Sequence, residues 1–100
     1  MPYYVYIVQC IDNTYYCGYT KDLKQRIKHH NNSSKGAKYT NSKRPVILKY
    51  FEKHLTLSKA LKREYKLKKL THLEKENLVK EFKSYLVNKN RQNIIKWSNH

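Results

Sequence analysis

Two short runs rich in aromatic and β-branched residues open the chain. They are "YYVYIVQC", residues 3–10, and "TYYCGYT", residues 14–20, and the polar segment 11–13 separates them. Runs of this length and composition on either side of a short polar segment predict two β-strands joined as a hairpin.

The length of the hairpin turn decides which side chains share a face of the sheet. A two-residue turn at Asp12 and Asn13 would place Tyr6 opposite Tyr19. A three-residue loop with Asn13 in the left-handed region would instead align even positions and bring Tyr6 and Tyr16 to one face. Because Asn is among the few residues that accept a positive φ, we favour the longer loop.

Four further elements follow the hairpin. The pattern predicts a helix capped by Thr20 and Asp22 and ending near residue 31, a strand at 46–51, a helix at 56–70 and a helix from 71 onward. The segment 31–45 holds Asn, Ser, Gly and Pro without apolar periodicity, so it is predicted to be a loop. The resulting fold class is α+β, a three-stranded antiparallel sheet flanked by helices in the order β-β-α-β-α-α. We expect one domain over residues 1–82 and a basic, helical extension over residues 83–100.

Apolar spacing predicts which helical residues face the sheet. In the last helix, Thr71 and Glu74 fit a capping box. The expected inward residues are Leu23 and Ile27 in the first helix, Leu57, Ala60, Leu61, Leu67 and Leu70 in the second, and Leu73, Leu78 and Phe82 in the third.

Three polar residues fall at inward positions among these apolar ones. Glu64 lies on the stripe of the second helix and is the only acid between Lys53 and Leu73. Arg26 and His30 lie one turn apart on the first helix. An unpaired buried carboxylate costs several kcal/mol, so Glu64 must meet a cation, a metal ion or water. For Glu64 alone, an ion pair with one of the many bases is the simplest interpretation.

The charge balance indicates a polyanionic partner. The 100 residues hold 22 Lys and Arg against 7 Asp and Glu, a formal charge of +15, and residues 1–20 contain no Lys or Arg. Such a chain suits nucleic acid or another anionic surface. No apolar run approaches the roughly 18 residues of a membrane span, so we expect a cytoplasmic protein with no membrane partner. The two cysteines, Cys10 and Cys17, are expected to be buried free thiols.

Two tyrosines on the sheet and three polar groups on the helices form a set suited to phosphodiester cleavage. The set is Tyr6, Tyr16, Arg26, His30 and Glu64. A carboxylate can hold Mg²⁺, an arginine can stabilise charge on the phosphate, and a phenol or imidazole can transfer a proton. With no second carboxylate for a paired-metal site, we expect one ion, Mg²⁺ or Mn²⁺.

At these residues the chain resembles the GIY-YIG nuclease superfamily, and in particular its small standalone single-domain members. The resemblance covers about residues 3–82. It is carried in order by "YVY" at 4–6, "YCG" at 16–18, "RIKHHN" at 26–31, "KGAKYT" at 35–40 and "ALKREYKLKKL" at 60–70. Tyr4 and Val5 stand where the first motif has Gly-Ile, and Cys17 stands where the second motif has Ile.

The resemblance implies a role for each member of the set. Tyr6 matches the proposed general base, Tyr16 the tyrosine that opens the second motif, Arg26 the catalytic arginine, His30 its frequent partner and Glu64 the metal-binding glutamate. Gly18 matches the second motif's glycine, whose missing side chain leaves room beside the substrate path. The implied activity is a metal-dependent endonuclease, structure-selective or non-specific, that hydrolyses phosphodiester bonds in DNA during repair or recombination, with RNA as the secondary partner.

Basic residues outside this set are expected to contact phosphates. They are Lys35, Lys38, Lys43 and Arg44 in the loop and Lys62 and Arg63 on the second helix. A catalytically inactive nucleic-acid-binding protein of the same fold explains this basic surface equally well. A ribosome-associated or membrane-surface protein explains the charge but leaves the inward polar set unexplained. Glu64 separates the first two alternatives, since a binding module gains nothing from an acid facing phosphates.

Overall fold

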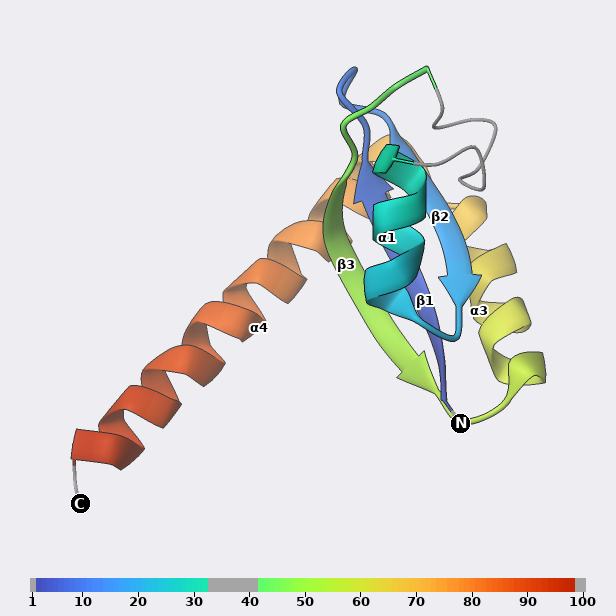
Figure 1. Cartoon of the computed structure of the whole chain (residues 1–100). Helices are drawn as coiled ribbons and strands as arrows, with labels where there is room; N and C mark the ends of the chain where they lie inside the picture. Colours follow the sequence, from blue (N-terminus) through green and yellow to red (C-terminus); the bar gives the residue numbers. More distant parts are fainter. Residues whose placement is uncertain (1, 33–41, 99–100) are drawn as a thin grey trace.

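The computed structural model describes residues 2–32 and 42–98, with side chains described as far as residue 89. Its elements in chain order are β1 (Tyr3–Gln9), β2 (Tyr15–Thr20), α1 (Leu23–Asn32), β3 (Ile47–His54), α3 (Leu57–Lys68) and α4 (His72–Ser98). The antiparallel strands form one sheet in the order β2-β1-β3. Helix α1 covers one face, α3 and the start of α4 cover the other, and the rest of α4 projects away from the sheet (Figure 1). The predicted α+β fold and element order are confirmed.

The β1–β2 hairpin has the three-residue loop that places Tyr6 and Tyr16 on one face. Asn13 has a φ of 68°, the left-handed conformation that the longer loop requires. The backbone N–H of Cys10 donates to the Thr14 carbonyl at 2.8 Å and closes the loop. Even positions therefore pair with even positions, with Tyr6 opposite Gly18.

The alternation of side chains along the strands divides the core into two clusters. The first lies beneath α1 and consists of Tyr6, Val8, Cys10 and Val46. The second lies beneath α3 and α4 and consists of Val5, Ile7, Cys17, Tyr50, Ala60 and Leu67. Both cysteines are buried free thiols, as predicted. Since each face of a three-stranded sheet needs its own apolar cover, helices on both sides are what make this small sheet stable.

Three leucines predicted to face the core are exposed instead. Leu57 and Leu61 are each 41% exposed, because the buried line of α3 runs through Ala60 and Leu67 and these two leucines lie to one side of it. Leu73 is 64% exposed, whereas Leu78 packs against the core as predicted. Two helical residues that are five positions apart are separated by one full turn plus about 140°, so Leu73 and Leu78 lie on different faces of α4.

Strand β3 runs three residues beyond its predicted end at Phe51. The added residues include Glu52 and His54, polar groups that an apolar pattern cannot assign to a strand. They remain in the sheet because Arg63 of α3 donates a hydrogen bond to the Glu52 carboxylate at 2.8 Å and His54 contacts the same carboxylate at 2.7 Å. The strand is thus completed by a polar network rather than by apolar burial.

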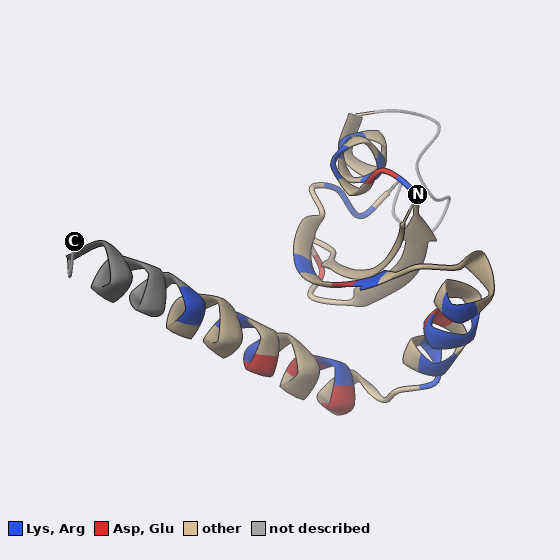
Figure 2. Ribbon diagram, turned by 90° about the horizontal axis from the view of Figure 1, so that it is seen from below, with Lys and Arg blue, Asp and Glu red and all other residues tan. Residues whose placement is uncertain are grey.

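Positive charge covers the helices unevenly. Lys and Arg gather along α3, whereas the first turns of α4 carry both signs (Figure 2). Thr71 caps helix α4, as predicted. Its hydroxyl accepts a hydrogen bond from the Glu74 N–H at 3.2 Å, and the Glu74 carboxylate accepts one from the Thr71 N–H at 2.9 Å. In the part of the chain that is described, no helix is both long and apolar enough to cross a membrane.

Candidate active site

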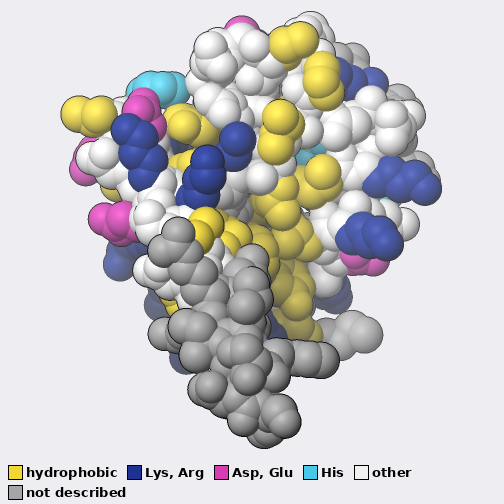
Figure 3. Space-filling model, turned by 90° about the vertical axis from the view of Figure 1, so that its left-hand side faces the viewer, with side chains coloured by type: hydrophobic (Ala, Val, Ile, Leu, Met, Phe, Trp, Pro, Cys, Tyr) yellow, Lys and Arg dark blue, Asp and Glu magenta, His cyan; other side chains and the backbone are white. Residues whose placement is uncertain are grey.

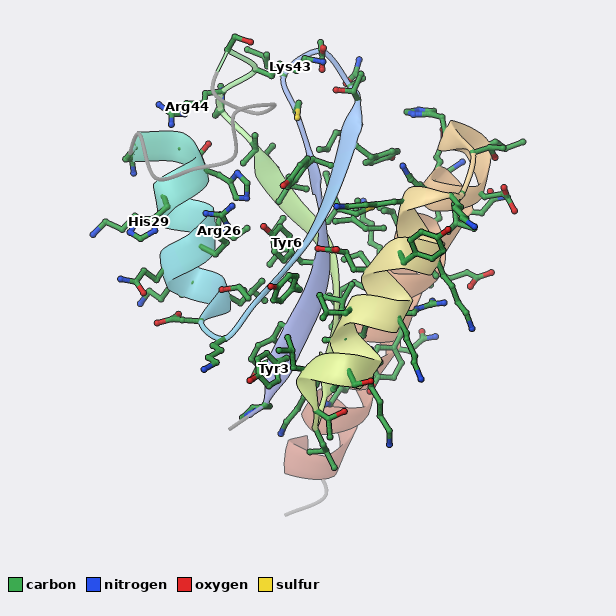
Figure 4. The ribbon with its side chains drawn as sticks, turned by 90° about the vertical axis from the view of Figure 1, so that its right-hand side faces the viewer. Tyr3, Tyr6, Arg26, His29, Lys43 and Arg44 are labelled. Carbon is green, nitrogen blue, oxygen red and sulfur yellow. The ribbon has the colours of Figure 1, made fainter. Side chains whose placement is uncertain are left out.

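Four of the five predicted site residues meet between the sheet and α1. Tyr6 is completely buried, and its hydroxyl lies 2.8 Å from Nε2 of His30. Nε of Arg26 donates to the same hydroxyl at 3.3 Å. The ring of Tyr16 meets the ring of His30 edge-on, with centroids 5.4 Å apart. Tyr6 and Arg26 point toward one another from the sheet and from α1 (Figure 4).

The glycine of β2 makes room for Tyr6. A Cβ built at Gly18 would lie 2.6 Å from the Tyr6 hydroxyl oxygen and 2.7 Å from Cζ. The phenol of β1 therefore lies across the backbone of the neighbouring strand, where any side chain would collide with it. The missing side chain of Gly18 was expected to leave room beside a substrate path, but the Tyr6 phenol fills that space. Gly18 therefore allows the Tyr6 hydroxyl to take its observed position.

Burial sets the protonation states of the two hydrogen-bonded groups. It raises the pKa of Tyr6 to about 12, although the hydrogen bond and charge of Arg26 act in the opposite direction. Burial, assisted by the positive charges of Arg26 and Arg44, lowers the pKa of His30 to about 4. At neutral pH the pair therefore consists of a protonated phenol and a neutral imidazole. The Tyr6 O–H can donate to Nε2 of His30 when the imidazole proton is on Nδ1.

The C-terminal end of α1 is clamped to the segment that leads into β3. Oδ1 of Asn31 accepts the Val46 N–H at 2.7 Å, and Nδ2 of Asn31 donates to the Val46 carbonyl at 3.1 Å. Nε of Arg44 donates to the His30 carbonyl at 2.5 Å. These contacts hold the helical turn that carries His30, so they position the imidazole against Tyr6.

Glu64 approaches from the other side of β2, on α3. In Figure 4, β2 runs between α1 and α3. The Glu64 side chain is only 15% exposed and pairs with Lys68 at 3.5 Å. This pair is longer than a strong charge-assisted hydrogen bond, and Lys68 is 52% exposed, so it holds the carboxylate weakly. Burial is the main cause that raises the pKa values of Tyr6 and Cys17, and the Glu64 charge adds a smaller contribution in the same direction.

The donor set allows one hard metal ion held mainly by non-protein ligands. The residues that the structure describes contain no group of three or more His, Cys, Asp or Glu side chains that could hold a metal ion. Mg²⁺ commonly uses one or two carboxylates and completes its shell with water and substrate phosphates. Glu64 alone fits that mode of binding and does not fit a closed, all-protein site.

The predicted phosphate contacts differ in their surroundings. Lys35 and Lys38 lie outside the described residues. Lys43 pairs with Asp12 of the hairpin loop at 3.1 Å, and Arg44 is bound to the end of α1. Both lie near that end of α1 in Figure 4. Lys62 is exposed on α3, whereas Arg63 reaches the sheet and binds Glu52.

Strand β3 carries a polar cluster that the sequence pattern did not predict. Glu52 accepts hydrogen bonds from Tyr50 and Arg63 and contacts His54. Tyr50, Glu52 and His54 alternate along one strand, and this spacing of two is the signal that places them on one face. The cluster ties α3 to β3, and its carboxylate is already occupied by three partners.

Comparison with known proteins gives a consistent assignment. A family model described as the GIY-YIG catalytic domain matches residues 2–77. The chain is 51% identical over 78 residues to the UPF0213 protein DP2720 of Desulfotalea psychrophila, covering 78% of this chain and 71% of the relative. The solution NMR structure of the UPF0213 protein BH0048 from Bacillus halodurans is 42% identical, with a TM-score of 0.52 over 80% of this chain and 84% of that one. The solution NMR structure of EF2693 from E. faecalis is 43% identical, with a TM-score of 0.57 over 82% and 86%.

Proposed function

Because the chain belongs to the GIY-YIG catalytic domain family, whose activity is that of a nuclease, we propose that it is a divalent-metal-dependent endonuclease acting on DNA. The observation that carries the proposal is the hydrogen-bonded chain from Arg26 through Tyr6 to His30, at the positions where the motifs match. A completely buried phenol between a guanidinium and an imidazole is an unusual core arrangement, and it has the connections that a proton transfer requires.

Tyr6 acts through a relay rather than as a free phenolate. With its pKa at about 12, the Tyr6 hydroxyl is protonated at neutral pH and is a poor base by itself. The 2.8 Å contact to the neutral His30 supplies the route. When substrate binding admits the attacking water to the buried Tyr6 hydroxyl, the hydroxyl oxygen takes a proton from that water and the Tyr6 proton passes to Nε2 of His30. The water oxygen then bonds to phosphorus, and the leaving oxygen departs with the electrons of the broken P–O bond.

Arg26 and Glu64 stabilise charge on opposite sides of this relay. Nε of Arg26 holds the Tyr6 hydroxyl, and its guanidinium is suited to stabilise the charge that develops on the phosphate. Glu64 would hold one Mg²⁺ or Mn²⁺, which supplies charge neutralisation and polarisation at the scissile phosphate. Tyr16, with its ring edge-on to His30, restricts the rotation of the imidazole.

The formal charge of +15 supports a substrate that is recognised through its phosphates. Phosphate contacts orient a nucleic acid but read little sequence, so the expected activity is structure-selective or non-specific and weakens steeply with salt. Selection by shape suits branched or flapped DNA of the kind that repair and recombination produce. RNA carries the same backbone charge and is the alternative substrate to be tested.

The test is a panel of duplex, flapped, branched and single-stranded DNA and RNA incubated with Mg²⁺ or Mn²⁺. Wild type should cut at least one DNA substrate, while Glu64→Ala and Arg26→Ala should lose the activity. Glu81→Ala is the matched control, because it removes an exposed carboxylate of α4 and should leave cutting unchanged. Equal cutting by all four proteins would overturn the proposed site. Binding without cutting by wild type would instead indicate a nucleic-acid-binding protein that has lost turnover.

A further inference from the structure

A groove runs between β3 and the first half of α4, and none of the five predicted site residues lines it. It consists of two hollows of about 470 Å³ and 290 Å³ that share Lys49, Val79 and Lys83 as a common wall. Figure 3 looks onto this side of the molecule and shows basic side chains beside an apolar band. The groove is therefore a continuous surface with positive charge at its middle.

Two lysines mark the centre of the groove. The register between β1 and β3 shifts between Ile7 and Val8, which pair with Tyr50 and Leu48 and leave Lys49 as the extra residue. Bulges of this kind re-aim a side chain out of the regular alternation. Lys49 and Lys83 form no ion pair or side-chain hydrogen bond with the described part of the chain. Their charges are therefore available to an anionic ligand.

Aromatic side chains lie in both hollows. In the larger hollow, the rings of Tyr15 and His72 are stacked, with centroids 4.9 Å apart and planes 27° apart. In the smaller hollow, Phe51 and Phe82 meet edge-on at 5.3 Å. Among the described residues, Glu76 is the only acid that lines the two hollows, and it is paired with Lys80 at 3.0 Å.

We propose that this groove binds a single-stranded segment of the nucleic-acid substrate, an inference that rests on the proposed function. Lysines between two aromatic surfaces match the way proteins bind single strands, in which cations track the backbone and bases stack on rings. Charge decides between this ligand and a second copy of the chain, whose apolar α4 surface could also enter the groove. A polyanion complements the positive charges of Lys49 and Lys83, whereas another chain of formal charge +15 would be repelled.

The test measures binding in EDTA, so that turnover plays no part. Fluorescence anisotropy would compare a blunt duplex with the same duplex carrying a single-stranded tail. The variants are Lys49→Glu/Lys83→Glu, His72→Ser, and the matched control Lys53→Glu/Lys59→Glu, which makes the same charge change at exposed residues outside the groove. Circular dichroism and urea unfolding would establish that every variant is folded.

We expect wild type to prefer the tailed duplex, and Lys49→Glu/Lys83→Glu to bind it about tenfold more weakly than the control does. The slope of log affinity against log salt should fall by about 1.4, since each single-strand phosphate contact contributes about 0.7. His72→Ser should weaken tailed-duplex binding and leave blunt-duplex binding unchanged. These losses would support the groove even if no variant, or wild type itself, cuts DNA, in which case only the proposed function fails.

Equal affinity of the groove variant and the control for the tailed duplex would overturn the inference while leaving a cutting enzyme intact. Sedimentation gives the second test. Two results together would assign the groove to a second copy of the chain. Wild type would be a dimer that Leu86→Lys converts to a monomer, and the groove variant and the control would bind the tailed duplex with the same affinity.

Discussion

The close approach of Tyr6 to Gly18 makes Gly18→Ala the sharpest structural test of the site. A Cβ at this position would lie 2.6 Å from the Tyr6 hydroxyl oxygen, about 0.8 Å short of ordinary contact at 3.4 Å. Tyr6 is completely buried and cannot move outward freely. The added methyl must therefore push the phenol away from β2, and the 2.8 Å contact to His30 must lengthen or break.

The cost follows from three opposing contributions. Forcing one extra methyl into a packed core costs about 1–3 kcal/mol. Losing the buried Tyr6–His30 hydrogen bond costs about 1 kcal/mol more. Replacing glycine within a strand returns about 0.5–1 kcal/mol of backbone entropy. We therefore expect the free energy of unfolding to fall by about 2 kcal/mol, a decrease in Tm of about 8–16 °C for a domain of this size.

A double-mutant cycle separates this collision from a general effect of the substitution. Urea unfolding would be measured for wild type, Gly18→Ala, Tyr6→Leu and the double variant. Leucine lacks the hydroxyl oxygen, Cζ and Cε2, the three tyrosine atoms nearest the added Cβ, so Gly18→Ala should cost little in that background. If Gly18→Ala is as stable as wild type, or costs the same with leucine at position 6, the phenol does not lie across Gly18.

Three further perturbations test the surroundings of the site. Asn31→Asp keeps the acceptor for the Val46 N–H but loses the donor to the Val46 carbonyl. We therefore expect the free energy of unfolding to fall by about 1–2 kcal/mol, and an unchanged urea midpoint would refute the clamp. Burial opposes ionisation of Glu52, but the hydrogen bonds to its carboxylate lower its pKa overall. The ionised carboxylate therefore contributes stability that is present above the ordinary pKa of 4.5 and is lost as pH falls. Glu52→Gln should flatten the decline of the urea midpoint between about pH 5 and pH 3, and a decline as steep as that of wild type would contradict this. Burial holds the pKa of His30 at about 4, below its ordinary value of 6.5, so the unfolded chain binds more protons than the folded chain between these two values. Stability should therefore fall as pH decreases through that range, and His30→Asn should remove this dependence. A wild-type urea midpoint that is the same at about pH 7 and pH 5 would contradict the prediction.

The hairpin and the helix boundaries could be predicted because they depend on local chemistry. A single residue able to adopt positive φ, Asn13, fixed the loop length and with it the face that Tyr6 and Tyr16 share. The capping pair Thr71 and Glu74 gave the start of α4 in the same way. Glu64 could be found because an acid interrupts an otherwise apolar stripe, which is visible in sequence spacing alone.

Features that depend on packing between distant elements could not be predicted in this way. The exposure of Leu73 follows from which side of α4 meets β3, and the apolar pattern of that helix is too broad to specify it. The polar end of β3 exists because Arg63, eleven residues later, satisfies Glu52. The contact between Tyr6 and His30 joins residues 24 apart, so the sequence could suggest their proximity but neither the hydrogen bond nor the raised pKa of the phenol.

The most direct test of the proposed nuclease is single-turnover DNA cleavage in Mg²⁺ by wild type, Glu64→Gln and Lys68→Gln. The two substitutions each remove one charge from the same weak pair, so they separate a role for the carboxylate from a role for the pair. We predict that Glu64→Gln slows cleavage by about 100-fold or more and that Lys68→Gln stays within a few-fold of wild type. Cleavage by Glu64→Gln at the wild-type rate would contradict the account.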